Sequence, residues 1–183
     1  SFVVVGHKAD LVTKYSKADD VVSVLQEPQL GTGHAVQVTV PVIDKSGYTV
    51  ILCGDVPLLK ADTVKKLIEE TIDSDCSASV LTCVVDDAGS YGRIVKDADG
   101  NFEAIVEARD ATEQQLAIGE YNSGVFCFKT KDMIDALGQL KSDNDQSEYY
   151  LTDTIEYLVG VGRKVRAVSI DDPVEVMGIN TVA

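Results

Sequence analysis

Short apolar runs alternate with helix-forming segments along the first 85 residues, and this alternation constrains the fold more than any other feature of the chain. Apolar strands are predicted at SFVVVG (1–6), VVSVLQ (21–26), YTVILC (48–53) and ASVLTCVV (78–85). Helices are predicted between them, over 8–15, 32–40 and 62–72. A strand–helix–strand succession predicts an α/β fold with a mixed, mostly parallel sheet and flanking helices.

The second half of the chain changes pattern, but no Pro/Gly/Ser-rich linker introduces it, so a single domain over residues 1–183 is expected. GRIVKDADGNFEAIVE predicts two short strands around a turn that contains Asp99 and Gly100. Further strands are predicted in YNSGVFCFK (121–129) and KVRAVSI (164–170), and helices over 131–140 and 152–159.

Charge and cysteine content argue against several classes of partner. The formal net charge of −14 disfavours nucleic acid and anionic membranes, because both bind basic surfaces. No apolar stretch approaches the roughly 18 residues that span a bilayer. The four cysteines form no C-x-x-C pair, so zinc is not expected, and reduced thiols in a cytoplasmic protein are the simplest interpretation.

Two polar residues follow predicted strands directly. Gln26 and Asp55 stand just past strand C-termini, which is where open α/β sheets bind ligands. Asp55 lies on a tight turn, where an exposed carboxylate suits a hard divalent cation beside a phosphate. A plain turn-forming role for Asp55 is the alternative.

The stretch QLGTGHAVQ (29–37) combines a glycine-rich loop with the start of a helix. Glycines allow close approach of a ligand to the backbone, and Thr32 can cap the helix, whose N-terminus attracts anions. This suggests a phosphorylated ligand, and a simple loop-to-helix junction is the alternative. His34 is interpreted as packed or hydrogen-bonded rather than as a catalytic base.

A second group of polar residues suits a sugar. Gly92 precedes a strand and permits close approach of a ligand, with a β-bulge as the alternative. Glu107 and Asn122 stand at strand ends and offer acceptors and an amide for hydroxyl groups. In SEYYLTD, Thr152 is a candidate N-cap. Since no nucleophile triad is visible, aligned substrates with metal-neutralised charge fit better than a covalent intermediate.

Seven segments occur together in the order and approximate spacing of one family: VLQEPQLGTGHA, GDVPLL, YGRIV, IVEARDATEQQ, YNSGVF, EYYLTD and GIN. From about Val3 to Asn180 the chain resembles the uridylyltransferase domain of the bacterial bifunctional N-acetylglucosamine-1-phosphate uridylyltransferase/glucosamine-1-phosphate acetyltransferases. LGTGHA and EYYLTD are its specific motifs, whereas GD or GIN alone would be weak.

The resemblance implies a glycosyltransferase-A-like nucleotidyltransferase fold. It implies a reaction of UTP with N-acetylglucosamine 1-phosphate that gives UDP-N-acetylglucosamine and pyrophosphate, with Mg²⁺ as cofactor. The product feeds cytoplasmic synthesis of peptidoglycan and lipopolysaccharide precursors. In this family a trimer is attributed to a β-helix domain that carries acetyl transfer, which these 183 residues do not contain.

The resemblance also assigns site residues. Gln26 and the pair Gly31–Thr32 would recognise the uracil and its ribose side, so the loop would bind the base rather than a phosphate. Asp55 and Asn180 would hold Mg²⁺. The remaining assigned positions bind substrate: Cys53, where the family usually has tyrosine, Gly92, Glu107, Asn122, Tyr150 and Thr152.

One family motif is absent from the 183 residues. The family opens with a strand and a glycine-rich basic loop of the form G-x-G-T-R-M, which holds the triphosphate. We therefore expect the sequence to be an N-terminally incomplete piece with little uridylyl transfer of its own. A sister sugar-1-phosphate nucleotidyltransferase and a non-catalytic sugar-nucleotide-binding domain are the alternatives.

Overall fold

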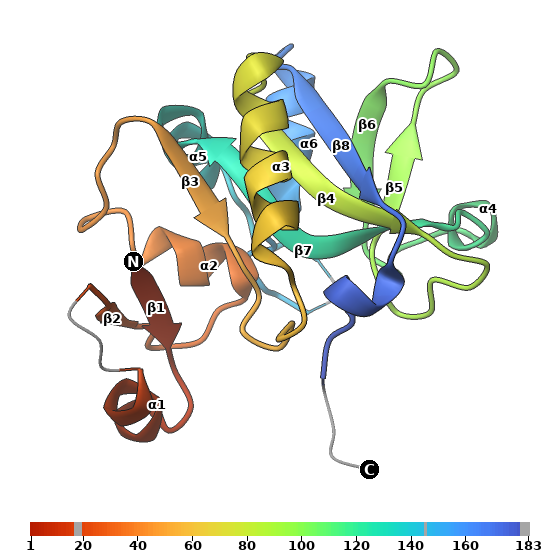
Figure 1. Cartoon of the computed structure of the whole chain (residues 1–183). Coiled ribbons are helices and arrows are strands. Elements are labelled where there is room, and N and C mark those ends of the chain that lie inside the picture. Colours follow the sequence, from red (N-terminus) through yellow and green to blue (C-terminus); the bar gives the residue numbers. More distant parts are fainter. Residues whose placement is uncertain (17–19, 145, 180–183) are drawn as a thin grey trace.

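A six-stranded mixed sheet forms the centre of the molecule (Figure 1). The computed structural model describes residues 1–16, 20–144 and 146–179. The strands of this sheet are β3 (Tyr48–Ile51), β4 (Ala78–Val84), β5 (Arg93–Lys96), β6 (Phe102–Val106), β7 (Glu120–Lys129) and β8 (Val165–Ile170). Their order is β6-β5-β7-β4-β8, and β3 pairs with β7 as well. The mixed sheet and its flanking helices confirm the predicted fold class.

The pairing inside this sheet differs from the mostly parallel arrangement that was predicted. Strand β7 runs antiparallel to β3, to β4 and to β5, and among the described residues only β4 and β8 form a parallel pair in this sheet. Ile51 of β3 and Val80 of β4 both lie opposite Phe126, so β7 separates these two strands. Apolar patterning shows which residues face a core, but it does not fix strand direction.

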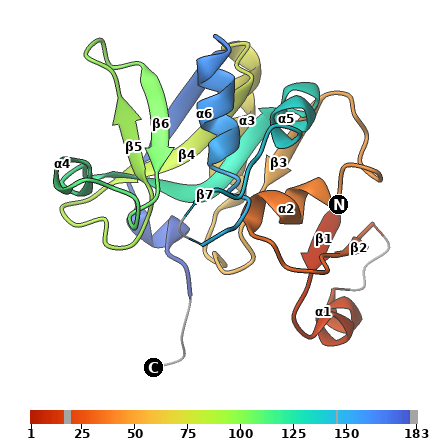
Figure 2. The ribbon, with the colours of Figure 1, turned by 180° about the vertical axis from the view of Figure 1, so that it is seen from behind.

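Helices cover both faces of the sheet. Helix α3 (Ala61–Asp73) lies across the face seen in Figure 1. The reverse view shows α2 (Thr32–Gln37), α5 (Thr130–Leu137) and α6 (Asp153–Gly160) on the opposite face (Figure 2). Within the described residues, no helix has the length and apolarity that a bilayer span requires.

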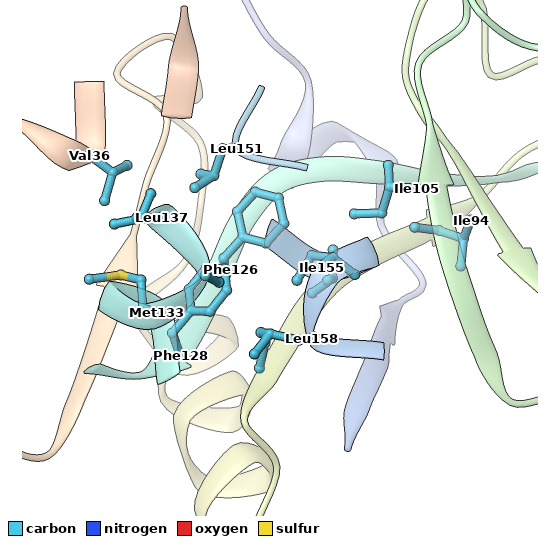
Figure 3. Packing of buried hydrophobic residues seen from close by; sticks show 13 residues of the cluster. Val36, Ile94, Ile105, Phe126, Phe128, Met133, Leu137, Leu151, Ile155 and Leu158 are labelled. Carbon is cyan, nitrogen blue, oxygen red and sulfur yellow. The ribbon is translucent and has the colours of Figure 1, made fainter. Parts of the chain in front are cut away.

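Strand β7 explains why the core has two halves. Phe126 and Phe128 point toward α5 and α6, where they pack with Met133, Leu137, Ile155 and Leu158 (Figure 3). Val125 and Cys127 belong to the other cluster, together with Leu67 of α3. Successive strand residues face opposite sides of a sheet, so the near-continuous apolar run in β7 fills both halves.

The first segments form a separate two-stranded sheet. Strands β1 (Phe2–Val5) and β2 (Val22–Leu25) pair in parallel, and α1 (Ala9–Tyr15) lies in the chain between them. Among the described residues of 1–31, only Val5 and Gln26 are buried. The β1–α1–β2 unit therefore gains little of its stability from burial of apolar surface.

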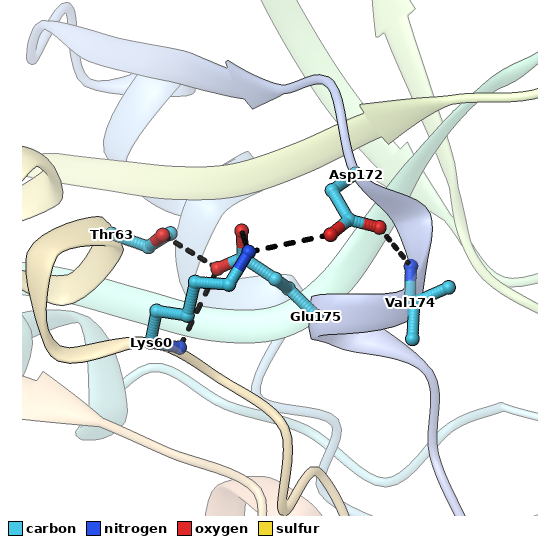
Figure 4. A network of polar contacts seen from close by, with 5 residues as sticks. All are labelled: Lys60, Thr63, Asp172, Val174 and Glu175. Carbon is cyan, nitrogen blue, oxygen red and sulfur yellow. Dashed lines mark hydrogen bonds and ion pairs between the residues drawn. The ribbon is translucent and has the colours of Figure 1, made fainter.

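A polar network fixes the last described segment. The 3₁₀ helix η1 (Pro173–Val176) carries Glu175, whose carboxylate contacts the Lys60 ammonium at 2.9 Å and accepts from the Thr63 hydroxyl at 2.6 Å (Figure 4). Asp172 adds a second contact to Lys60 at 3.3 Å. Because Glu175 is only 7% exposed, this network holds η1 firmly against the start of α3.

Two elements were not anticipated. Helix α4 (Glu113–Leu116) begins with a capping box in which Thr112 and Gln115 exchange side-chain and backbone hydrogen bonds. The T-x-x-Q signature was present in the sequence and could have predicted this helix. The short η1 helix has Pro173 at its start, which is a weaker signal.

Candidate active site

Two motifs that are far apart in the sequence meet at the start of α2. The Gly33 N–H donates to the Tyr149 carbonyl at 2.7 Å, and the Tyr149 N–H donates to the Leu30 carbonyl at 2.8 Å. The Leu151 N–H donates to the Thr32 hydroxyl at 3.0 Å. The LGTGHA loop and the EYYLTD segment therefore form one structural unit.

The glycines of the loop are required by this contact. Gly31 has φ of 105°, and a Cβ there would lie 2.7 Å from the Tyr149 carbonyl oxygen. A Cβ at Gly33 would lie 2.9 Å from the same oxygen. The N-cap of α2 is Gly31, and Thr32 is the first residue of the helix, where its hydroxyl accepts from the Leu151 N–H. The predicted cap is wrong, and the glycines serve close packing of protein on protein.

Gln26 lies behind this loop at the C-terminal end of β2. Its backbone N–H donates to the Val5 carbonyl at 2.8 Å, and its side chain is buried. Its Nε2 donates to the Gly31 carbonyl at 2.9 Å and contacts His34 Nδ1 at 3.2 Å. The interpretation of His34 as a hydrogen-bonded residue is confirmed.

A cavity of about 510 Å³ opens beside Gln26 at the ends of β1 and β2. Gln29, which the sequence analysis did not single out, also lines it. The Gln29 amide packs on Gly6, where a Cβ would lie 1.9 Å from Nε2. A second glutamine three residues after Gln26, directly before LGTGHA, was the signal that could have identified it.

Four of the predicted sugar-site residues lie together. The Thr152 hydroxyl donates to Glu107 Oε1 at 3.0 Å, and the other carboxylate oxygen of Glu107 would lie 3.3 Å from a Cβ at Gly92. The Asn122 N–H donates to the Gly92 carbonyl at 2.8 Å. Thr152 occupies the N-cap position of α6, as predicted, but its side chain makes no cap hydrogen bond, because the hydroxyl donates to Glu107.

The electrostatic environment of this group is acidic. Burial raises the pKa of Tyr150, and the nearby charges of Asp110, Glu148 and Glu107 add to the effect. Burial, together with Glu156, Glu107 and other carboxylates, raises the pKa of Asp153 to about 6. Hydroxyl groups of a sugar suit this environment, because carboxylates accept hydrogen bonds from them.

Cys53 connects the sugar-site residues to Asp55. Its thiol donates to the Gly124 carbonyl at 3.3 Å, and the Gly124 N–H donates to Asn122 Oδ1 at 2.9 Å. Gly124 has φ of 79°, and a Cβ there would lie 2.6 Å from the sulfur. Burial, and secondarily the Asp55 charge, raises the pKa of Cys53, so the thiol acts here as a neutral packing group.

Asp55 is exposed on the turn after β3. Its carbonyl accepts from the Ile179 N–H at 2.8 Å, and the Gly178 N–H donates to the Tyr91 hydroxyl at 3.2 Å. The chain thus passes Asp55 immediately before Asn180, which lies outside the described residues. Among the described residues, no cluster of three His, Cys, Asp or Glu side chains could hold a metal ion.

A single exposed carboxylate nevertheless suits Mg²⁺ at a phosphate site. Mg²⁺ keeps several waters and is commonly held by one or two carboxylates together with substrate phosphates. Asp55 offers one such oxygen ligand on a turn in which the Val56 N–H donates to the Cys53 carbonyl at 3.4 Å. One carboxylate is compatible with a magnesium ion that arrives with a nucleotide, and the assignment of Mg²⁺ stays a prediction.

The predicted residues consequently form a connected line through the molecule. Each residue is joined to the next by a hydrogen bond, by close packing or through a chain neighbour, and Cys53 is joined to Asn122 through Gly124. The order is Gln26, Gly31, Thr32, Tyr150, Thr152, Glu107, Gly92, Asn122, Cys53 and Asp55. The series thereby links Gln26 to Thr152, which lies more than 120 positions further along the sequence.

Comparison with known proteins gives a consistent picture. The nucleotidyl transferase family model matches residues 5–172. The chain is 45% identical over 179 residues to the bifunctional protein GlmU of Acetivibrio thermocellus, and 46% identical over 179 residues to that of Paraburkholderia phymatum. These matches cover 97% and 98% of the chain but only 39% of each relative.

Solved structures of low sequence identity share the fold. A UDP-glucose pyrophosphorylase complexed with UDP-glucose aligns with a TM-score of 0.73 at 14% identity, over 93% of this chain and 71% of that chain. HddC from Yersinia pseudotuberculosis aligns with a TM-score of 0.65 at 21% identity, over 92% of this chain and 68% of that chain. With the family match spanning most of its length, the chain belongs to the nucleotidyl transferase family.

Proposed function

We propose that this chain carries the base, sugar and metal positions of a uridylyltransferase that makes UDP-N-acetylglucosamine from UTP and N-acetylglucosamine 1-phosphate. The observation that carries the proposal is the connected line from Gln26 to Asp55. Family membership supports nucleotidyl transfer in general, and the similarity to proteins named GlmU supports this particular reaction.

The proposed chemistry is an in-line displacement. A phosphate oxygen of the sugar phosphate attacks the α-phosphorus of UTP, and the bond from that phosphorus to the bridging oxygen breaks. Pyrophosphate leaves with the electron pair. Bound Mg²⁺ would supply positive charge to neutralise the phosphates, with Asp55 and Asn180 as its proposed ligands.

The chain's own residues would orient the two substrates. Gln26 Oε1 would accept from the uracil N3–H, since its Nε2 is already engaged. Glu107, held by Thr152, would accept from a sugar hydroxyl. Asn122 would donate through Nδ2, because its Oδ1 is used by Gly124. Such fixed orientation lowers the entropic part of the barrier.

Several wider assignments belong to the same proposal. We place the reaction in the cytoplasm, in synthesis of peptidoglycan and lipopolysaccharide precursors, and we expect trimers only in full-length proteins of this kind. The chain spans 39% of the length of the relatives with which it was compared, so acetyl transfer is not proposed for it.

Because the 183 residues contain no G-x-G-T-R-M segment, we propose that this chain alone turns over slowly or not at all.

Calorimetric titration of the 183-residue chain with UDP-N-acetylglucosamine, with and without Mg²⁺, tests the proposal. We expect binding that strengthens with Mg²⁺ and exceeds that of UDP-glucose. Asp55→Ala should remove the Mg²⁺ effect and leave the metal-free affinity unchanged. Equal affinity for both sugar nucleotides would favour a sister enzyme, and no binding would contradict the proposal. Release of pyrophosphate from UTP by the purified chain would refute the proposal that the chain alone is inactive.

A further inference from the structure

The side-chain amide of Gln26 has a defined orientation. The Gly31 carbonyl oxygen can only accept a hydrogen bond, so the atom 2.9 Å from it is the amide nitrogen. The second amide proton then points to His34 Nδ1, 3.2 Å away. Both donors of the amide are thereby engaged. Its oxygen has no hydrogen-bond partner among the described residues, and Gln26 lines the cavity of about 510 Å³.

His34 contributes a specific protonation state to this arrangement. A nitrogen that accepts a hydrogen bond carries no proton, so the imidazole must hold its proton on Nε2. The ring stands beside Tyr149, with 6.5 Å between ring centroids. The Gly33–Tyr149 bond fixes the turn that supplies both the Gly31 carbonyl and His34. The N-cap and the first turn of α2 thus provide both acceptors for Gln26.

The orientation of this amide determines which pyrimidine it can pair with. Uracil presents a donor at N3, whereas cytosine presents an acceptor at N3 and an amino group at C4. The amide oxygen, which no described residue engages, would accept from the uracil N3–H and would be repelled by the cytosine N3 lone pair. A rotated amide would present its NH₂ and would match cytosine instead.

We propose that His34 is a positioning residue for base selection: by accepting the second amide proton of Gln26, it holds the amide oxygen toward the nucleotide and favours uracil over cytosine. This inference rests on the proposed function, which supplies a uridine nucleotide as ligand. Without His34, only the Gly31 carbonyl opposes rotation of the amide, and selection for uracil weakens.

Affinities of the 183-residue chain for UTP and CTP test the inference, because the two nucleotides differ only in the base. We expect the wild-type chain to favour UTP by about tenfold or more. His34→Phe keeps a ring but removes the acceptor, and should reduce the UTP:CTP ratio about fivefold. His34→Asn can place an oxygen near the position of Nδ1 and should restore most of the ratio.

A variant on the same helix controls for damage to α2. Gln37 donates its amide to the Leu137 carbonyl at 2.7 Å, so Gln37→Ala should leave the UTP:CTP ratio unchanged. Nitrogen NMR of the ligand-free chain gives a readout without nucleotide, in which the imidazole of His34 should show an unprotonated Nδ1.

The outcomes separate this inference from the function on which it rests. A protonated Nδ1, or the same ratio in wild type and His34→Phe, would overturn the role of His34 while leaving uridylyl transfer intact. Binding of neither nucleotide would overturn the proposed function, and the role in base selection with it. A UTP:CTP affinity ratio that falls in His34→Phe and recovers in His34→Asn supports the inference, because a merely structural role of His34 would not change this ratio.

Discussion

The hydroxyl of Thr152 donates to Oε1 of Glu107 at 3.0 Å, and this bond joins α6 to the end of β6 across 45 positions of sequence. It occupies the hydroxyl that would otherwise cap the helix. The bond fixes one carboxylate oxygen of Glu107 and leaves the other over the backbone of Gly92. Thr152 therefore orients a carboxylate that we assign to the sugar.

Replacing Thr152 by valine keeps the shape of the side chain and removes this bond. We expect affinity for UDP-N-acetylglucosamine to fall about fivefold, because a freely rotating carboxylate must be ordered on binding. Affinity for UMP, which lacks the sugar, should stay the same. Thr154→Val removes a hydroxyl bonded to the Leu151 carbonyl and serves as control. Equal losses for both ligands would argue for general damage to α6.

Asp55→Asn should abolish the Mg²⁺ dependence of UTP binding at unchanged fold stability. Asn keeps the size of the side chain but lacks the charge that a hard cation requires. Titration with UTP in Mg²⁺ and in EDTA measures the effect. Asp62→Asn, in the first turn of α3, is a matched exposed control. A retained Mg²⁺ effect in Asp55→Asn would place the metal elsewhere.

Glu175→Gln should destabilise the fold by about 1–3 kcal/mol, since it removes a charged acceptor from a buried network. Hydrogen bonds from Thr63 and Lys60 lower the pKa of Glu175 below its ordinary value of 4.5. A lowered folded-state pKa gives stability that is present above pH 4.5 and lost as pH falls through that lowered value. In urea unfolding, the difference in free energy of unfolding between the wild-type chain and Glu175→Gln should therefore become smaller at acid pH.

The exposed pair of Lys65 and Glu69 provides the comparison for that experiment. Its atoms lie 3.7 Å apart, and both side chains are more than half exposed. Glu69→Gln should change the free energy of unfolding by less than about 0.5 kcal/mol at either pH. If Glu175→Gln and Glu69→Gln changed the free energy of unfolding equally, the η1 network would contribute no more to stability than an exposed ion pair.

Asp153→Asn should stabilise the chain near pH 7 and have little effect at pH 4. Burial, followed by the charge of Glu156, raises the pKa of Asp153 to about 6. The folded state then binds a proton more tightly than the unfolded state, so stability falls as pH rises from about 4 to 6. The gain should be about 1 kcal/mol, because Asp153 also begins α6, where a negative charge is favourable.

Thermal unfolding at the two pH values measures this effect. Asp10→Asn removes a carboxylate from the first turn of α1 and controls for the lost interaction with a helix terminus. Destabilisation by Asp153→Asn at pH 7 would mean that the helix terminus outweighs burial at this position.

Gly33→Ala should destabilise the chain by about 1–3 kcal/mol, because the added Cβ would lie 2.5 Å from Leu140 and 2.9 Å from the Tyr149 carbonyl oxygen. Gly160→Ala introduces a Cβ with no atom within 4 Å and should be neutral or slightly stabilising. Denaturant unfolding compares the two. A neutral Gly33→Ala would mean that the contact between LGTGHA and EYYLTD can move without cost.

Much of the fold could be predicted from apolar patterning, which located the eight strands of the described residues, and their helices other than α4 and η1, to within a few residues. Strand direction could not be predicted, because β7 reads as an apolar strand whether it runs parallel or antiparallel to its neighbours. The two predicted threonine caps had different outcomes. Gly31 rather than Thr32 occupies the N-cap of α2, whereas Thr152 stands at the N-cap of α6 but gives its hydroxyl to the distant Glu107.

The candidate site, like the fold, could be predicted from the sequence only in part. Motif order identified residues that the fold brings together, although their spacing gave no sign that Cys53 would contact Gly124. The pairing of Gln26 with His34 depends on a turn geometry that patterning does not describe. The assignment of Asn180 to the metal stays a prediction, since this residue lies outside the described part of the chain, and so does the single-domain boundary.

The separate β1–α1–β2 sheet has a consequence for local unfolding. A unit that buries little besides Val5 and Gln26 can open at a free-energy cost well below that of the β4–β7 core. Since Gln26 is part of this unit, opening would remove base recognition while the rest of the chain stays folded. A nucleotide that binds only the closed form would stabilise it by mass action. Affinity for the base and local order of this unit are then two measures of one equilibrium.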